Sequence, residues 1–332
     1  MSKVKDNAYL ALTAMLRARE ARMLDRDRMD RMLSAGSYAD AAKLLTDCGY
    51  EDMSALDAGQ LDGVLSARKQ AIYEEIHRMS PEPELVDIFR LKYDYHNAKV
   101  VIKAAGAGTD GEHLFSEVGR VTGEQIVNAI NEDKYTDLPP VLAEAIQEAK
   151  ATLAKSGNPQ LADFVLDRKY FAEMSAMAAR QGSAFLVGYV KTMIDASNLR
   201  TAVRTVRMNK GQEFLLQALI EGGSIDCNTL AVAALSGESL AGLFTATCLF
   251  TAAQAGVEAM KGGSMTKFEL ACDNAITAYL SSAKLVSFGS EPVVKYLALV
   301  EAEITAVRMI LAGKMAGIAP TVIRERLRDI DA

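Results

Sequence analysis

The sequence predicts an all-α protein built from three similar multi-helix domains. Alternation of apolar and polar residues typical of strands is not sustained anywhere, and helical spacing recurs along the chain. A short motif of an acidic residue, an asparagine and two basic residues recurs at intervals of roughly one hundred residues, which indicates a repeated unit. At 332 residues, half of them apolar, the chain is long enough for two or three packed domains.

The repeated signature reads Asp-x-x-Asn-x-basic-x-x-x-basic. It occurs cleanly twice, as Asp94, Asn97, Lys99 and Lys103 and then as Asp195, Asn198, Arg200 and Arg204. A third, altered copy keeps Glu303 and Arg308 but has Ala306 where Asn is expected. A fixed-period array of helical domains forms a ring, a funnel or a solenoid. We expect domain boundaries that divide the chain into residues 1–105, 106–209 and 210–332.

Proline and glycine residues predict the helix boundaries in chain order. A break at residues 36–37 ends the first helical region, and the Pro-Glu-Pro run at 81–83 separates two long helices, the second over about 84–105. Further breaks are expected at 106–111, 138–140, 182–183, 222–223 and 262–263, and new helices are expected to begin near 159, 183, 292 and 320.

The signature acids lie on the apolar side of their helices. In the first two copies apolar residues fall within about 40° of the acid on a helical wheel, and the Asn lies beside it. A buried acid and amide need hydrogen-bond donors and acceptors from a neighbouring helix or helix end. We therefore interpret five residues as structural braces: Asp94, Asn97, Asp195, Asn198 and Glu303. A metal site or proton relay at each acid is the alternative, and no nearby His or second carboxylate supports it.

The basic residues of the signature point to the opposite side of the helix, at about 140° and 180° from the acid. They form either a solvated face or a docking surface for an acidic partner. The candidate docking residues are Lys99, Lys103, Arg200, Arg204, Arg308 and Lys314.

Several classes of function find no support in the sequence. The net charge of −6 supplies no basic field for nucleic acid, and no phosphate-binding Gly-x4-Gly-Lys-[Ser/Thr] loop indicates nucleotide binding. The three histidines lack metal-ligand spacing, and no Gly-x-Ser-x-Gly nucleophile motif occurs. The four cysteines form no Cys-x-x-Cys pair and no secretory start is visible, which favours a reduced, cytoplasmic protein. We expect no catalytic, cofactor or metal site.

One stretch, Leu240 to Val257, carries no charged residue and approaches the length of about 20 residues that a membrane helix needs. It contains two glycines, three threonines and a glutamine, and no Trp or Tyr flanks it. We expect a buried pair of helices here rather than a membrane span.

Longer motifs along the whole chain resemble the C subunit of the V/A-type rotary ATPases, the counterpart of the eukaryotic d subunit. The matching segments are Tyr9 with Arg17-Ala-Arg-Glu20, Asp94-Tyr-His-Asn97-Ala-Lys99, Asp167-Arg-Lys-Tyr170-Phe171, Ile194 to Thr201, Gly289-Ser-Glu-Pro292, Glu301-Ala-Glu303, Gly313-Lys314 and Ile323-Arg-Glu325. Ala306 departs from the family pattern, which places the third brace in question.

The resemblance implies a pseudo-threefold, funnel-shaped body on the cytoplasmic face of the membrane rotor ring. Its cavity would receive the central shaft of subunits D and F, and the protein would pass torque between shaft and proteolipid ring without binding ATP or moving ions itself. Contact with the membrane stator subunit would be transient. Two alternatives stay open: a helical scaffold for soluble partners, and an all-helical enzyme, which would need convergent carboxylates or a cofactor in its cavity.

Overall fold

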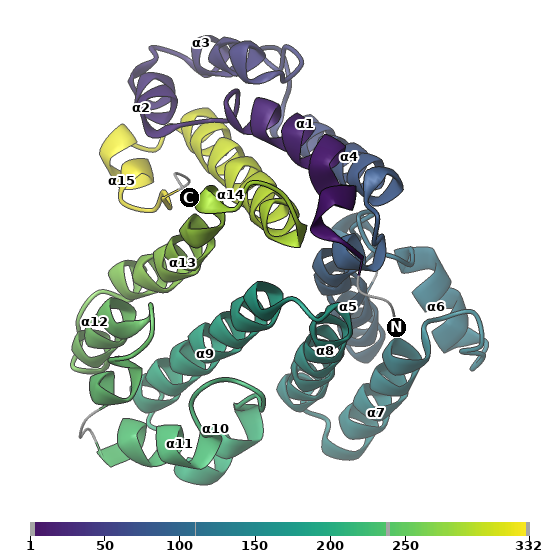
Figure 1. Cartoon of the computed structure of the whole chain (residues 1–332). Coiled ribbons are helices and arrows are strands. Elements are labelled where there is room, and N and C mark those ends of the chain that lie inside the picture. Colours follow the sequence, from purple (N-terminus) through teal and green to yellow (C-terminus); the bar gives the residue numbers. More distant parts are fainter. Residues whose placement is uncertain (1–3, 110, 237–239, 330–332) are drawn as a thin grey trace. The chain divides into compact units, whose positions relative to one another are not determined.

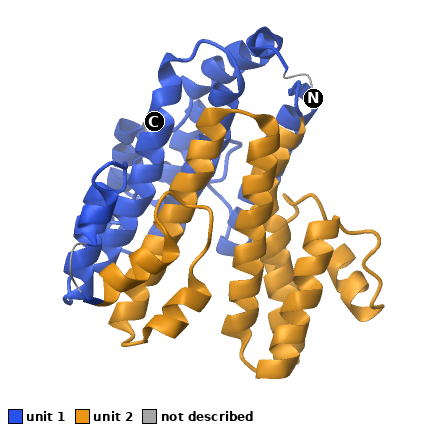
Figure 2. Ribbon diagram, turned by 60° about the horizontal axis from the view of Figure 1, so that its bottom comes forward, with its two compact units in different colours: residues 1–82, 236–332 blue, residues 83–235 orange. Residues whose placement is uncertain are grey.

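The computed structural model describes residues 4–109, 111–236 and 240–329, and over these ranges it consists of helices and connecting turns without a β-strand. This confirms the all-α prediction. The chain divides into two compact units, one formed by residues 1–82 and 236–332 and the other by residues 83–235 (Figure 2). These units divide the chain by compactness and not by the sequence repeat, so they do not test the predicted domains 1–105, 106–209 and 210–332. The division into three domains stays a prediction.

Unit 1 combines the first and last parts of the chain. Its long C-terminal helix α14 (Ser290–Met315) packs against α1, α2, α3 and α4 from the beginning of the chain (Figure 1). These four helices are α1 (Leu10–Glu20), α2 (Arg26–Ser34), α3 (Tyr38–Lys43) and α4 (Ala58–Met79). The other elements of this unit are η1 (Asp6–Tyr9), η2 (Leu44–Cys48), η4 (Ala241–Phe244), α12 (Phe250–Met260), α13 (Met265–Ser281), η5 (Ser282–Leu285) and α15 (Pro320–Arg324).

Unit 2 is continuous in sequence. Its helix α8 (Pro159–Gln181) packs against α5, α7 and α9, so that two signature helices share one long neighbour. The other elements are α5 (Glu84–Ala107), η3 (Glu112–Leu114), α6 (Gly123–Asn131), α7 (Pro140–Ser156), α9 (Ala184–Arg207), α10 (Gln212–Ala218) and α11 (Cys227–Ser236).

The helix boundaries follow the local sequence chemistry. Pro140, Pro159 and Pro320 occupy first turns, where the missing N–H costs no intrahelical hydrogen bond. Gly108 and Gly182 end α5 and α8 in left-handed conformations, which glycine adopts without strain. The predicted separation of α4 from α5 at residues 81–83 is confirmed.

The uncharged stretch from Leu240 to Val257 forms the 3-10 helix η4, a turn and most of α12. The expected pair of helices is present, although the first of the two is a short 3-10 helix rather than an α-helix. Its buried side chains include Phe244 and Leu249, and α12 packs against α13. Within the described residues, no helix combines the length and hydropathy that crossing a membrane requires.

Candidate braces and docking residues on the signature helices

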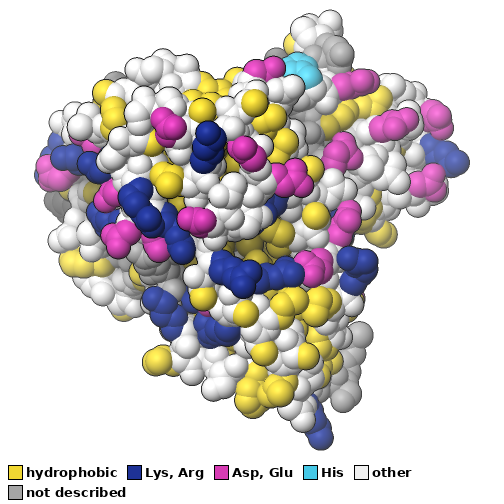
Figure 3. Space-filling model, turned by 90° about the horizontal axis from the view of Figure 1, so that it is seen from above, with side chains coloured by type: hydrophobic (Ala, Val, Ile, Leu, Met, Phe, Trp, Pro, Cys, Tyr) yellow, Lys and Arg dark blue, Asp and Glu magenta, His cyan; other side chains and the backbone are white. Residues whose placement is uncertain are grey.

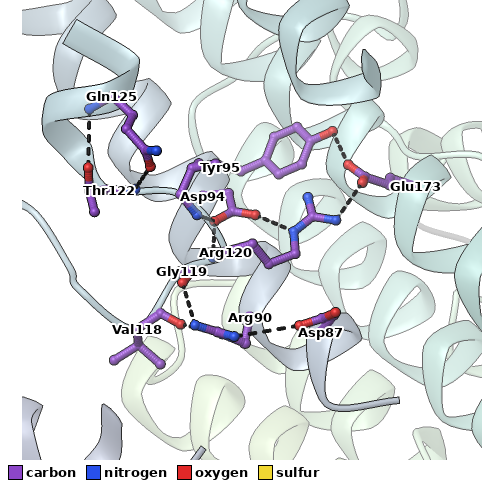
Figure 4. Close-up of polar contacts among 11 residues, drawn as sticks. Asp87, Arg90, Asp94, Tyr95, Val118, Gly119, Arg120, Thr122, Gln125 and Glu173 are labelled. Carbon is purple, nitrogen blue, oxygen red and sulfur yellow. Dashed lines mark hydrogen bonds and ion pairs between the residues drawn. The ribbon is translucent and has the colours of Figure 1, made fainter. Parts of the chain in front are cut away.

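The first signature acid, Asp94 on α5, is completely buried and accepts hydrogen bonds from a neighbouring loop. Its Oδ1 accepts from the backbone N–H of Arg120 at 2.7 Å and of Val121 at 3.2 Å. Its Oδ2 accepts from Arg120 Nε at 2.6 Å (Figure 4). These donors come directly before Thr122, the N-cap of α6. The acid therefore holds the start of the next helix against α5.

Arg120 extends this contact into a buried network. Its Nη1 lies 3.0 Å from Glu173 Oε1 on α8, and the Tyr95 hydroxyl donates to Glu173 Oε2 at 2.8 Å (Figure 4). Burial raises the pKa of Asp94, and the Arg120 charge opposes that rise. One arginine thus compensates two buried carboxylates on two different helices, an arrangement in which losing either partner is costly.

The signature amide binds the same loop a few residues earlier. Asn97 Oδ1 accepts from the backbone N–H of Ser116 at 2.9 Å, and its Nδ2 donates to the backbone carbonyl of Ser116 at 2.9 Å. Asn97 is fully buried. Asn97 therefore hydrogen-bonds both the N–H and the C=O of Ser116. Ser116 lies outside the helices, so no helical hydrogen bond satisfies these two backbone groups.

The second copy repeats this geometry on α9. Asp195 Oδ1 accepts from the backbone N–H of Ser224 at 2.8 Å and of Ile225 at 3.3 Å, and Asn198 pairs with both backbone groups of Ile220 at 2.9 and 2.7 Å. Asp226 then caps α11 by accepting from Thr229 N. In both copies the acid binds the two residues before the N-cap, and the amide binds the sixth residue before it. Burial raises the pKa of Asp195.

The third copy, on α14, holds a helix at the other end of the sequence. Glu303 Oε2 accepts from the backbone N–H of Leu24 at 2.7 Å, although the two residues are 279 positions apart. Its Oε1 accepts from the Tyr50 hydroxyl at 2.7 Å. Leu24 directly precedes Asp25, the N-cap of α2. Burial raises the pKa of Glu303. The last signature helix thus holds the entry to α2 inside unit 1.

The third copy differs from the other two at the position of the Asn. The amides of the first two copies bind Ser116 and Ile220, the sixth residue before each N-cap, and both of these residues lie in irregular chain. The sixth residue before the α2 N-cap is Arg19, which lies inside α1, and its carbonyl accepts from the backbone N–H of Arg22 at 2.9 Å. The third copy therefore has no irregular residue at the corresponding position for an amide to bind.

Replacing Ala306 by Asn is therefore expected to weaken the fold, although Asn is the residue of the other two copies. Ala306 is buried, and a new amide there would need hydrogen-bond partners that an alanine does not require. An unsatisfied buried polar group costs about 1–3 kcal/mol. Urea denaturation of the variant and the parent measures the difference, and a variant more stable than the parent would contradict this account of the third copy.

A glycine lies directly before the backbone donors of the first two acids. A Cβ on Gly119 would stand 2.5 Å from Asp94 Oδ1, and one on Gly223 would overlap the Asp195 carboxylate. Gly119→Ala is expected to displace the buried acid and destabilise the protein by about 1–3 kcal/mol, as overpacking does. Gly63→Ala in α4 is the control, since a Cβ there meets nothing within 4 Å. Equal unfolding midpoints for the two variants would contradict the expected clash.

The braces offer acceptors rather than a reactive centre. Each acid is occupied by backbone N–H groups, with an added arginine at Asp94 and an added tyrosine at Glu303. Across the ranges that the structure describes, no group of three or more His, Cys, Asp or Glu side chains is arranged to hold a metal ion. The contacts fit the structural interpretation of Asp94, Asn97, Asp195, Asn198 and Glu303, which stays a prediction until stability is measured.

The candidate docking residues have partners within the chain. Lys99 and Lys103 lie 2.6 Å from Asp167 and Asp163 on α8. Arg308 pairs with Asp62 of α4 at 2.6 Å, and Lys314 Nζ donates to two carbonyls at the end of α2. Arg200 is half-buried and Arg204 is exposed on α9, and each also interacts with another group of the chain. Basic and acidic side chains are interspersed on the face in Figure 3, so no uniformly basic surface marks this view. Docking by these residues stays a prediction.

Comparison with known proteins gives the family. Residues 12–326 match the profile described as ATP synthase (C/AC39) subunit, which covers nearly the whole chain. The chain belongs to this C/AC39 family. The resemblance found in the sequence motifs is thereby confirmed.

Relatives of the C/AC39 chain come from bacteria and archaea. The C subunit of the V-type sodium ATPase of Enterococcus hirae is 24% identical over 325 residues, which cover 97% of this chain and 98% of the relative. The C subunit of the A-type ATP synthase of Methanocaldococcus jannaschii is 22% identical over 96% of this chain and 86% of its own length. That of Methanobrevibacter smithii is 25% identical over 96% and 88%. The similarity spans both compact units of the C/AC39 chain.

Sequence reasoning missed the partners of the C/AC39 signature acids, above all Arg120, Glu173 and Tyr50. A signal for the bound loops was present, however. An apolar residue precedes each N-cap and another follows four positions after it, the pattern of a hydrophobic staple. These pairs are Val121 and Ile126, Ile225 and Leu230, and Leu24 and Met29. Aligning these three apolar pairs would have identified the helix entries that the signature acids bind.

Proposed function

We propose that this chain is a non-catalytic rotor component that couples the central shaft of a V/A-type ATPase to its membrane proteolipid ring. In this role it transmits torque for ATP-linked proton or sodium transport. The supporting observation is the family match over residues 12–326, together with relatives named as the C subunits of V-type and A-type complexes, which align over nearly their full length. The partners are shaft subunits D and F and the ring proteolipid, with transient contact to the membrane stator.

The braces supply a property that this role needs. Torque passes efficiently only through a body whose helices do not rotate or slide against one another under load. Each signature acid joins its helix to the entry of another helix through buried hydrogen bonds, and such bonds constrain direction better than apolar contacts alone. We place the protein on the cytoplasmic face of the membrane, as a peripheral component without nucleotide or nucleic-acid binding of its own.

A pull-down from native membranes tests this function. Tagged protein is recovered from membranes solubilised in mild detergent, and its partners are identified by mass spectrometry. Recovery of subunits D and F together with the proteolipid supports the rotor role. Recovery of soluble partners alone, from cells that contain the rotary complex, favours the general helical scaffold instead.

Charge reversal tests the docking surface on α9. The double variant Arg200→Glu and Arg204→Glu is expected to bind the isolated D–F shaft at least about tenfold more weakly, because reversed charges oppose an acidic partner surface. Surface-immobilised D–F complex and a concentration series of each variant measure the dissociation constant. Arg180→Glu, at the exposed end of α8, is the matched control. Unchanged shaft affinity in the double variant would remove Arg200 and Arg204 from the interface.

A further inference from the structure

Unit 1 contains a short segment that forms one side of a cleft. Residues 324–329, which we call the strap, begin at the end of α15 and contribute two arginines to the lining of this cleft. The cleft has a volume of about 310 Å³, and the rest of its lining includes Met265 and Leu270 of α13 and Met309 of α14. The proposed rotor role assigns no task to it. The two ends of the strap are attached differently, and this difference indicates how the cleft opens.

The beginning of the strap is fixed by a buried apolar contact. The helix that leads into it, α15, packs against α14 and α2 (Figure 1). Ile323 of this helix is 2% exposed, and a Cβ added to Gly313 of α14 would stand 2.6 Å from Ile323 Cδ1. Arg324 pairs with Asp30 of α2 at 2.8 Å. Salt screens exposed charges but leaves a buried apolar contact in place, so this end stays attached when the ionic strength rises.

The tip of the strap, Arg328 and Asp329, is attached by polar contacts at partly exposed positions. Arg328 Nε donates to Asp273 Oδ2 of α13 at 2.7 Å. The Asn274 side-chain amide donates to Asp329 Oδ2 at 2.7 Å, and Asn274 Oδ1 accepts from the Asp329 backbone N–H at 3.0 Å. Asp329 also lies 3.7 Å from Arg26 of α2, and both of these side chains are more than half exposed. Exposed ion pairs contribute little to stability and are weakened by salt, so this end is the one that can detach.

The packing of α13 gives the tip its importance. Among the described residues of unit 1, the main packing partners of α13 are α12 and η5, and α14 is not one of them. The cleft lies between the beginning of α13 and α14. Leu270 in the cleft lining and Asn274 are four residues apart on the same side of α13, so the tip reaches this helix beside the cleft. The strap therefore links α13 to α14 and α2 along one side of the cleft.

We propose that the strap is a releasable closure of this cleft. Its beginning stays attached at Ile323, whereas its tip leaves Asp273 and Asn274 reversibly. The cleft then loses the side that the two strap arginines form, and its apolar lining, which includes Met265 and Met309, becomes more exposed. Because charged groups hold the tip, rising salt concentration favours the open form. The contacts of the third brace lie outside the strap, so the brace stays intact when the strap opens.

Limited digestion of the full-length chain with trypsin tests this proposal, because trypsin cuts after arginine and the strap contains exposed Arg326. The backbone N–H of Arg326 donates to the Ile323 carbonyl at 3.0 Å, and that of Leu327 donates to the Arg324 carbonyl at 3.2 Å. Cleavage between Arg326 and Leu327 requires this turn to open. When opening and closing are fast relative to cleavage, the cleavage rate follows the population of the open form. Mass spectrometry of the intact chain measures the loss of residues 327–332.

Two substitutions of Asn274 are expected to release the tip to different extents. Asn274→Ala removes both hydrogen bonds to Asp329 and should raise the cleavage rate after Arg326 at least about threefold. Asn274→Asp places a second carboxylate opposite Asp329 and should raise this rate at least about tenfold at low salt, with a smaller difference from the parent at high salt. Cleavage of both variants at the rate of the parent would overturn the proposal.

Controls within the same digestion separate release of the strap from general unfolding. Gln254→Ala changes an exposed residue of α12 outside the cleft lining and should leave the cleavage rate unchanged. Cleavage after Arg180, at the exposed end of α8 in unit 2, is the internal reference. Equal acceleration after Arg180 and Arg326 in the Asn274 variants would overturn the proposal, because it would show unfolding of the whole chain. Cleavage rates are normalised to those of a short arginine peptide at each salt concentration. The digestion uses the isolated chain, so its failure leaves the rotor function untouched.

Discussion

Asp94→Ala is expected to destabilise the protein by about 3–5 kcal/mol, the cost of removing one partner from a buried ion pair. The substitution removes the carboxylate that accepts from Arg120 Nε. It also leaves the backbone N–H groups of Arg120 and Val121 without an acceptor. Glu173 compensates only part of the arginine charge. Guanidinium denaturation followed by circular dichroism measures the loss.

Asp195→Ala is the matched comparison for this prediction. Asp195 binds backbone N–H groups in the same register, and its main donors are Ser224 and Ile225 rather than an arginine. The expected loss is therefore smaller, about 1–3 kcal/mol. An Asp94→Ala variant as stable as the parent would refute the brace interpretation. A larger loss of stability in Asp195→Ala than in Asp94→Ala would refute the added contribution of the Arg120 ion pair.

Glu303→Ala is the second large effect that we expect, with a loss of about 2–4 kcal/mol from two buried donors that lose their acceptor. These donors are the Leu24 backbone N–H and the Tyr50 hydroxyl. Glu303→Gln keeps an acceptor oxygen for Leu24, and the Tyr50 hydroxyl can rotate to accept from the new amide. The Gln variant should therefore retain most of the stability. Equal losses in the two variants would show that the hydrogen bonds of Glu303 contribute little.

The pH dependence of the Glu303 variants has a definite sign. Burial raises the pKa of Glu303 in the folded chain above that of an unfolded glutamate. Between the unfolded and the folded pKa, the folded chain holds a proton that the unfolded chain has released, so this group's contribution to stability falls as pH rises. Glutamine does not titrate. The stability of Glu303→Gln relative to the parent should therefore improve from about pH 4 toward neutrality. A relative stability that worsens over this range would contradict the burial effect.

The signature shows how far sequence reasoning reached. Helical periodicity placed Asp94, Asp195 and Glu303 on the apolar sides of their helices, and all three are buried. Prolines and glycines located most helix ends, because their effect on the backbone is local. The altered third copy was noticed but not understood. The structure shows what differs there: the residue that corresponds in register to Ser116 and Ile220 is Arg19, which lies inside α1.

The sequence by itself determined the helical class, the repeated signature, the buried side of each signature helix and the family of the protein. These properties depend on residue spacing within a few helical turns or on whole-chain similarity, and both can be seen without coordinates. Only the tertiary structure decided what each acid binds. Arg120 reaches Asp94 across 26 residues, and Leu24 reaches Glu303 across 279. Such pairings depend on how helices pack, which local periodicity does not encode. The same packing placed Lys295 beside Glu20, 275 residues earlier in the chain.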